Sequence, residues 1–125
     1  MHCGSCASIK RTVSQNCLEI SPIPFAVAPE GSITLDNVYQ SAGGTVIATG
    51  VINVQGTLSP DTDIILTFQK GTTTVATITF DNVTVGSTLG FTVQTPFDNM
   101  DITVDNNDAT ITSIGTLDIV LVVNY

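Results

Sequence analysis

Apolar residues recur at every second position along most of this chain, and that two-residue period constrains its fold more than any other feature. Ile64, Leu66 and Phe68, for example, alternate with residues that tolerate solvent. Successive side chains of a β-strand point to opposite faces, so the pattern predicts half-buried strands. No segment places apolar residues at helical spacing over three turns, and we therefore expect an all-β protein.

The alternation defines the side chains that we expect to face the core. These rows are Ile33 and Leu35; Val46, Ala48, Ile52 and Val54; Ile64, Leu66 and Phe68; Ala76, Ile78 and Phe80; Leu89, Phe91 and Val93; Met100, Ile102 and Val104; and Leu117, Ile119, Leu121 and Val123. About eight short strands joined by turns rich in Gly, Pro, Asn and Asp predict a jelly-roll-like β-sandwich.

Three local features refine this expectation. Gly50 falls in an inward row and predicts a bulge or bend. Ala109 and Ile111 indicate one more short strand. Residues 21–24 contain two prolines, which cannot donate ladder hydrogen bonds, so we expect an edge strand or a hinge there.

All three cysteines and the only histidine lie within residues 1–17, as do two of the three basic residues. We therefore divide the chain into a flexible N-terminal connector arm, 1–17, and a β-sandwich body, 18–125. A body of this length buries a core without needing metals or disulfides, so Cys3, Cys6 and Cys17 require another explanation.

Three interpretations of the cysteines compete. A zinc site would use them with His2, but His2 adjoins Cys3 and the second half of the usual ligand pair is missing. A redox Cys-x-x-Cys pair normally begins a helix, and none is predicted here. The favoured interpretation is an exposed arm whose thiols reach cysteines of other copies, which suits an odd number of cysteines at one terminus.

Charge and residue types argue against other functions. A net charge of −8 with three basic residues disfavours binding to nucleic acid or to an anionic membrane. No apolar run is long enough to cross a bilayer. His2 lies at a terminus without a nucleophile, so we expect no enzyme, and residues 105–108 lack the Gly and Glu of a calcium loop, which favours a solvated turn. We expect no metal and no cofactor.

The predicted registers leave a surplus of apolar residues on the outside. A single exposed apolar residue is ordinary, but a group of them makes candidates for lateral contact between subunits, through packed faces or paired strand edges. These candidates are Ile47, Val51, Ile65, Val120 and Val122.

The cysteine arm resembles that of the endospore appendage (ENA) fibre subunits of Bacillus-type bacteria. Cys3 and Cys6 match a connector pair and Cys17, after ten intervening residues, matches a third cysteine; the later likeness comprises residues 90–93 and 97–102, Gly115 and Tyr125. Two departures are that Gly4 and Ser5 separate the paired cysteines and that a late-strand cysteine is absent. These departures point to the thinner, ladder-like type built of stacked rings.

The resemblance implies a self-assembling structural subunit of an extracellular spore-surface fibre. Cys3 or Cys6 of the arm would bond Cys17 of a neighbour, and the body would make lateral contacts. Residues 1–6 show no secretion signal, and the resemblance implies synthesis in the mother cell and release on lysis, with other spore-surface or tip proteins as further partners. The alternative is a trimeric jelly-roll binding or adhesin module on a surface filament.

Overall fold

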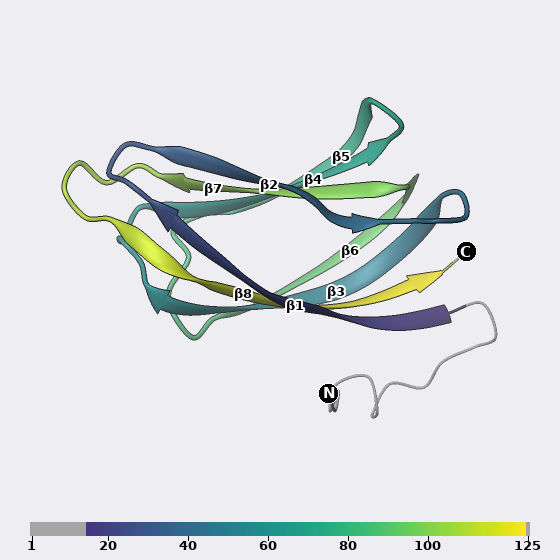
Figure 1. The fold of residues 1–125 in the computed structure, drawn as a ribbon, viewed down its shortest axis with the longest axis horizontal. Coiled ribbons are helices and arrows are strands. Elements are labelled where there is room, and N and C mark those ends of the chain that lie inside the picture. Colours follow the sequence, from purple (N-terminus) through teal and green to yellow (C-terminus); the bar gives the residue numbers. More distant parts are fainter. Residues whose placement is uncertain (1–14, 125) are drawn as a thin grey trace.

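The computed structural model describes residues 15–124, and in this part of the chain it contains eight β-strands and no helix (Figure 1). The strands are β1 (Gln15–Val27), β2 (Ser32–Gln40), β3 (Val46–Thr57), β4 (Thr62–Lys70), β5 (Thr73–Phe80), β6 (Thr88–Phe97), β7 (Asn99–Asn106) and β8 (Ser113–Asn124). Residues 15–124 accordingly offer no helix of the length and hydropathy needed to cross a membrane.

The strands form two four-stranded antiparallel sheets that pack face to face (Figure 1). Sheet A has the order β1-β8-β3-β6 and sheet B the order β2-β7-β4-β5. Most connections cross from one sheet to the other, which is the double Greek-key arrangement of a jelly roll. This architecture confirms the all-β, jelly-roll-like sandwich of about eight strands that the periodicity predicts.

The core lies between the sheets and contains the predicted inward rows. It also contains five buried residues that the rows do not include, namely Phe25, Val27, Tyr39, Val83 and Phe97. Rows on the central strands β3, β4, β7 and β8 are buried, whereas several members on β2, β5 and β6 are partly buried because those strands lie at sheet edges. Phe68 is at the centre, with its ring centroid 4.9 Å from that of Phe97 and 6.0 Å from that of Phe91. The pair with Phe97 is edge-to-face and the pair with Phe91 is tilted, and both join the two sheets.

Gly50 faces the core as expected, but the predicted bulge or bend at this position is wrong. Gly50 pairs regularly with Phe91 on β6 and Leu121 on β8, and the register shift of β3 lies between Val46 and Ala48. A Cβ at Gly50 would lie 2.6 Å from Cζ of Phe91 and 2.7 Å from Cδ2 of Leu121. Glycine therefore makes room for the phenylalanine ring.

Two other local expectations need correction. Ala109 and Ile111 lie in an exposed loop, where the Asp108 carboxylate accepts hydrogen bonds from the backbone N–H groups of Thr110 and Ile111, both at 2.8 Å, and so forms a turn. Residues 21–24 do lie on an edge strand, with a register shift between Ile20 and Ile23. They are no hinge, because β1 continues on both sides of them from Gln15 to Val27.

A buried polar cluster, Ser59, Thr62, Asn106 and Ser113, ties the strands together at one end of the sandwich; we call it the polar latch. Asn106 Nδ2 donates to the carbonyls of Val27 at 3.1 Å and Ile111 at 2.7 Å, and its Oδ1 accepts from the Ser59 hydroxyl at 2.7 Å. The Thr62 hydroxyl lies 2.6 Å from that of Ser113. Asn106 is thus buried, contrary to the solvated turn expected for residues 105–108.

Gly50 offers a test of the packing. We expect Gly50→Ala to lower the free energy of unfolding by about 1–3 kcal/mol, because the added methyl overpacks the core against Phe91 and Leu121. Gly90→Ala is the matched control, since a Cβ there meets nothing within 4 Å. Urea unfolding compares the two variants, and equal stabilities would contradict the packing argument.

The polar latch gives a second test. Asn106→Ala should cost about 2–4 kcal/mol of unfolding free energy, because it leaves more than one buried carbonyl or hydroxyl without a partner. The neighbouring exposed Asn107→Ala should change stability by less than about 1 kcal/mol. Thermal and urea unfolding measure both effects. A loss of unfolding free energy in Asn106→Ala no larger than that in Asn107→Ala would show that the polar latch contributes little to stability.

Candidate functional site

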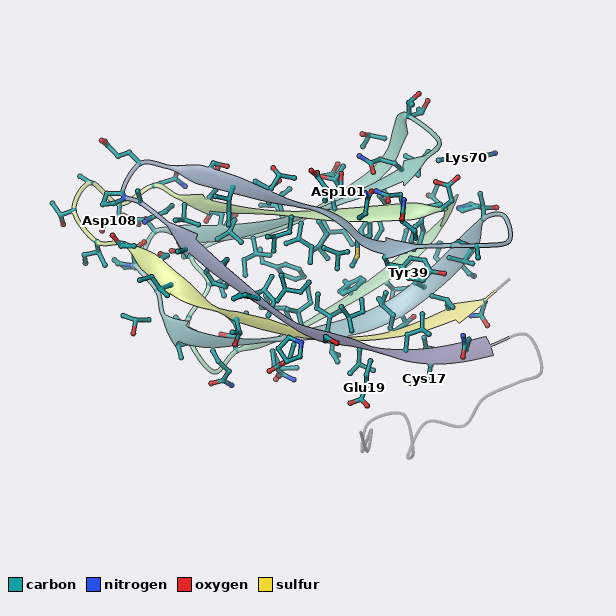
Figure 2. The ribbon with its side chains drawn as sticks, viewed as in Figure 1. Cys17, Glu19, Tyr39, Lys70, Asp101 and Asp108 are labelled. Carbon is teal, nitrogen blue, oxygen red and sulfur yellow. The ribbon has the colours of Figure 1, made fainter. Side chains whose placement is uncertain are left out.

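Cys17 lies within β1, on the outer face of sheet A. It pairs with Val122 on β8, while the flanking Leu18 packs against the core. Figure 2 shows Cys17 and Glu19 projecting from β1 away from the other sheet. Cys17 is half-buried and disulfide-bonded, and its bonding partner lies outside the described residues.

The other predicted site residues of the arm, Cys3 and Cys6, lie outside the described residues, and so does His2. The boundary that we expected after residue 17 falls inside β1, which begins at Gln15. Cys17 is therefore a surface residue of the body itself. This places its chemistry on a rigid element, whereas the two remaining cysteines precede the first strand.

Three of the five candidate contact residues lie on β8 and β3, on the same outer face of sheet A as Cys17. Val122 lies opposite Cys17, and Val120 lies between Glu19 on β1 and Val51 on β3. All three valines are half-buried. We call Cys17, Val51, Val120 and Val122 the Cys17 patch.

The other two candidates lie on different sheets. Ile47 pairs with Asn124 on the same outer face of sheet A, at the end where β1 begins and near Cys17. Ile65 lies on the outer face of sheet B, between Thr79 and Thr103. Four of the five candidates therefore share the outer face of sheet A, and Ile65 alone lies on sheet B.

An apolar groove lies on the outer face of sheet A, at the far end from Cys17. It encloses about 870 Å³ and is lined by Pro24, Phe25, Ala26, Gln55, Gly56, Thr57, Ile114, Gly115 and Thr116. Two of its lining residues, Gly56 and Gly115, pair directly across β3 and β8. A Cβ on either glycine would collide with a carbonyl oxygen of the opposite strand, so this close approach excludes side chains.

We call this feature the Gly115 groove, and no charged residue of the described range 15–124 lines it. Ile114 on its rim is 55% exposed, the largest value among the exposed large apolar residues of the described chain. Sequence reasoning missed the groove. The available signal was a glycine at an inward position of a predicted strand, but only the register reveals that two such glycines face each other.

A second hollow, of about 590 Å³, is acidic and lies beside the β2–β3 and β4–β5 connections. Asp98 accepts hydrogen bonds from the Gly71 N–H at 3.1 and 3.2 Å, and Asp101 accepts from the Asn37 N–H at 2.8 Å. The latter bond fixes Asn37 in the left-handed backbone region, with φ of 55°. The carboxylates of Asp98 and Asp101 thus hold turns in place.

The described residues contain no cluster of three or more His, Cys, Asp or Glu suited to a metal ion.

Burial alone would raise the pKa of Asp101, but hydrogen bonds from the Asn37 backbone and the Asn99 and Gln69 side chains outweigh it and hold the pKa below its usual value of 3.8. At Asp108 the N–H groups of Thr110 and Ile111 likewise hold the pKa below its usual value. Both shifts favour the ionised form that the turns require.

Comparison with known proteins supports the fold. No protein-family model and no curated protein matches the sequence. Among solved structures, the infectious bursal disease virus VP2 subviral particle has a TM-score of 0.58 at 13% identity, covering 92% of this chain and 33% of that one. Derived T=1 particles of the same virus give 0.57 at 12% identity, with coverages of 94% and 33%.

A chain from Bacillus endospore appendages, described as a novel family of disulfide-linked pili, has a TM-score of 0.44 at 17% identity, covering 93% of this chain and 96% of that one. At such identities the capsid likenesses show the jelly-roll fold alone, and the looser appendage likeness adds no weight to it. This chain spans about a third of the length of the viral proteins that it matches.

Asp101 yields a prediction on pH. Its pKa is lower in the folded chain than in the unfolded one, so its stabilising contribution is complete above the unfolded value and is lost as the pH falls through the folded value. The stability gap between wild type and Asp101→Asn should therefore be constant from about pH 7 to 5 and shrink below about pH 4. Urea unfolding across this range measures the gap.

Thr103→Ala, on the same outer face of β7, serves as the control because it removes no titrating group. Its stability difference from wild type should not depend on pH. A gap for Asp101→Asn that persisted unchanged to the acid limit would contradict the assignment.

Proposed function

We propose that this chain is a structural subunit that assembles with copies of itself into a fibre cross-linked by disulfides. The observation that carries the proposal is the position of Cys17, disulfide-bonded on the outer face of the body. Both other cysteines precede the first strand. A chain with three cysteines cannot pair all of them internally, so at least one thiol per chain remains for a neighbour.

In an isolated chain the bond of Cys17 is made within that chain. The same bond between two chains requires only that the arm of one copy replace the arm of another, which is the principle of domain swapping. An arm thiolate attacks the Cys17 disulfide of the neighbour, and the cysteine that it displaces leaves as a thiolate, so the number of disulfides is unchanged. The outer position of Cys17 allows this exchange without unfolding the body.

Charge distribution supports contact between arm and body. All eleven acidic residues lie after Cys17, whereas two of the three basic residues, Lys10 and Arg11, lie in the arm. Bodies that carry a net negative charge repel one another, and a positively charged arm attracts the body of a neighbour. Salt screens both effects, so assembly should depend on ionic strength.

The Cys17 patch fits the seat of an arriving arm better than a lateral contact, because Val120 and Val122 adjoin the cysteine that the arm must reach. Ile47 and Ile65 remain candidates for lateral packing. The edge strands β1, β6, β2 and β5 offer unpaired backbone groups through which copies can also join side by side.

The resemblance of the cysteine arm to endospore appendage subunits extends this proposal. On that basis we propose a spore-surface, extracellular location, a stacked-ring fibre, and contact with other spore-surface or tip proteins. The chain would be a structural protein without catalytic activity or cofactor.

Electrophoresis with and without reductant tests the proposal. Oxidised wild-type protein should give a ladder of covalent oligomers that reductant collapses to monomer, and negative-stain microscopy should show fibres. Cys17→Ser, and Cys3→Ser combined with Cys6→Ser, should abolish the ladder while the body stays folded, because it buries its core without them. Ser8→Ala in the arm is the control and should retain the ladder.

Monomers in both lanes without polymers would contradict the fibre. Compact trimers that bind a glycan would instead favour the alternative binding or adhesin module. Failure of the Cys3→Ser, Cys6→Ser variant to fold would show that the arm stabilises its own subunit.

A further inference from the structure

We propose that the Gly115 groove is the seat for the arm of a second copy of this chain, stacked end to end with the first. The inference rests on the proposed function and deepens it, because it names where the arm lies between its own body and the Cys17 of its neighbour.

The groove has the properties of a site for an apolar segment. Gly56 and Gly115 pair with each other among its lining residues, and none of the charged residues in the described part of the chain lines it. β3 and β8 approach each other closely here, since any Cβ on the glycines would strike backbone. The exposed Ile114 borders this hollow, and burying such a rim gains hydrophobic free energy.

The groove and the start of β1 lie at opposite ends of sheet A. Pro24 and Ala26 of the groove are near the end of β1, whereas the arm joins β1 at Gln15. Figure 1 shows β1 running from one end of the sandwich to the other. If two copies stack in the same orientation, the arm therefore leaves one copy at the end that adjoins the groove of the next copy.

The arm is long enough for this path. Fourteen residues precede β1, and when extended they span roughly 48 Å. Along β1 the groove lies seven to nine residues from Cys17, which corresponds to roughly 23–30 Å. An arm that enters over the groove can thus cross it and still bring Cys3 or Cys6 to the Cys17 of the same neighbour.

The arm's sequence suits the same path. Val13 lies two residues before β1, so it is the apolar arm residue nearest to the point where the arm leaves its own body. We assign Val13 to the groove. Seven positions then separate it from Cys6, which is roughly 24 Å when extended.

The first experiment measures how fast the disulfide ladder forms. Ile114→Asp on the rim, and Val13→Asp in the arm, should each slow it at least about tenfold, because a carboxylate would have to enter an apolar contact. Ile111→Asp and Val85→Asp are matched controls: these side chains are 43% and 45% exposed but lie outside the groove. Both should form the ladder at the wild-type rate.

A second experiment locates the contact directly. In chains that carry Cys3→Ser, Cys6→Ser and Cys17→Ser, one copy also carries Val13→Cys and the other Ile114→Cys. Mixed and oxidised at a concentration at which wild type assembles, these chains should form the heterodimer at least about tenfold faster than a mixture in which Ile111→Cys replaces Ile114→Cys. Only trans contact can produce this species.

The outcomes separate the two proposals. A wild-type chain that forms no covalent ladder overturns the fibre and the groove together. A wild-type ladder that Ile114→Asp and Ile111→Asp form equally fast, or equal heterodimer yields from the two cysteine mixtures, overturns the groove alone. Ala26→Glu, at another exposed position in the groove, repeats the first test if Ile114→Asp does not fold.

Discussion

The hydrogen bonds of Asn106 hold together the end of the sandwich that carries the groove. One buried side chain binds the carbonyl of Val27 at the end of β1, the loop carbonyl of Ile111 before β8, and the Ser59 hydroxyl before β4. Ser113 of the polar latch is followed along β8 by Ile114 and Gly115, which line the groove. The latch therefore also fixes the strands from which the groove is built. A polar network buried in an apolar core is stable only when it is fully satisfied, and that requirement specifies one arrangement of these strand ends.

The two-sided geometry of β1 directs the cysteine outward. Leu18 and Ile20 pack against the core. Side chains alternate between the two faces of a strand, so Cys17, next to Leu18, must face away from the core. A slip of one residue in the pairing with β8 would bury Cys17 and expose Leu18. The register of an edge strand therefore controls the accessibility of the Cys17 sulfur, and the apolar rows that stabilise the body also place this sulfur on the outer face.

The alternation of apolar residues predicted the fold and the inward rows because both depend on local periodicity. The same pattern placed Val120 and Val122 on the outside, but it could not show that they adjoin Cys17 while Ile65 lies on the other sheet; that requires the strand order. Gly50 looked like a bend because its partner Phe91 is distant in sequence. Ala109 and Ile111 looked like a strand because the capping by Asp108, and the burial of Asn106, leave no periodic signal.

An arm that leaves one end of a body and finds its seat at the other makes a head-to-tail contact. Such a contact is not self-complementary, so each added copy offers the next one the same unfilled seat, and growth continues unless the geometry closes a ring. In the fibre that we propose, the shallow apolar groove would give a weak contact that sets position, while a disulfide at Cys17 would make dissociation depend on breaking a covalent bond. Dividing these roles lets subunits align reversibly before they are locked, which favours regular fibres over disordered aggregates.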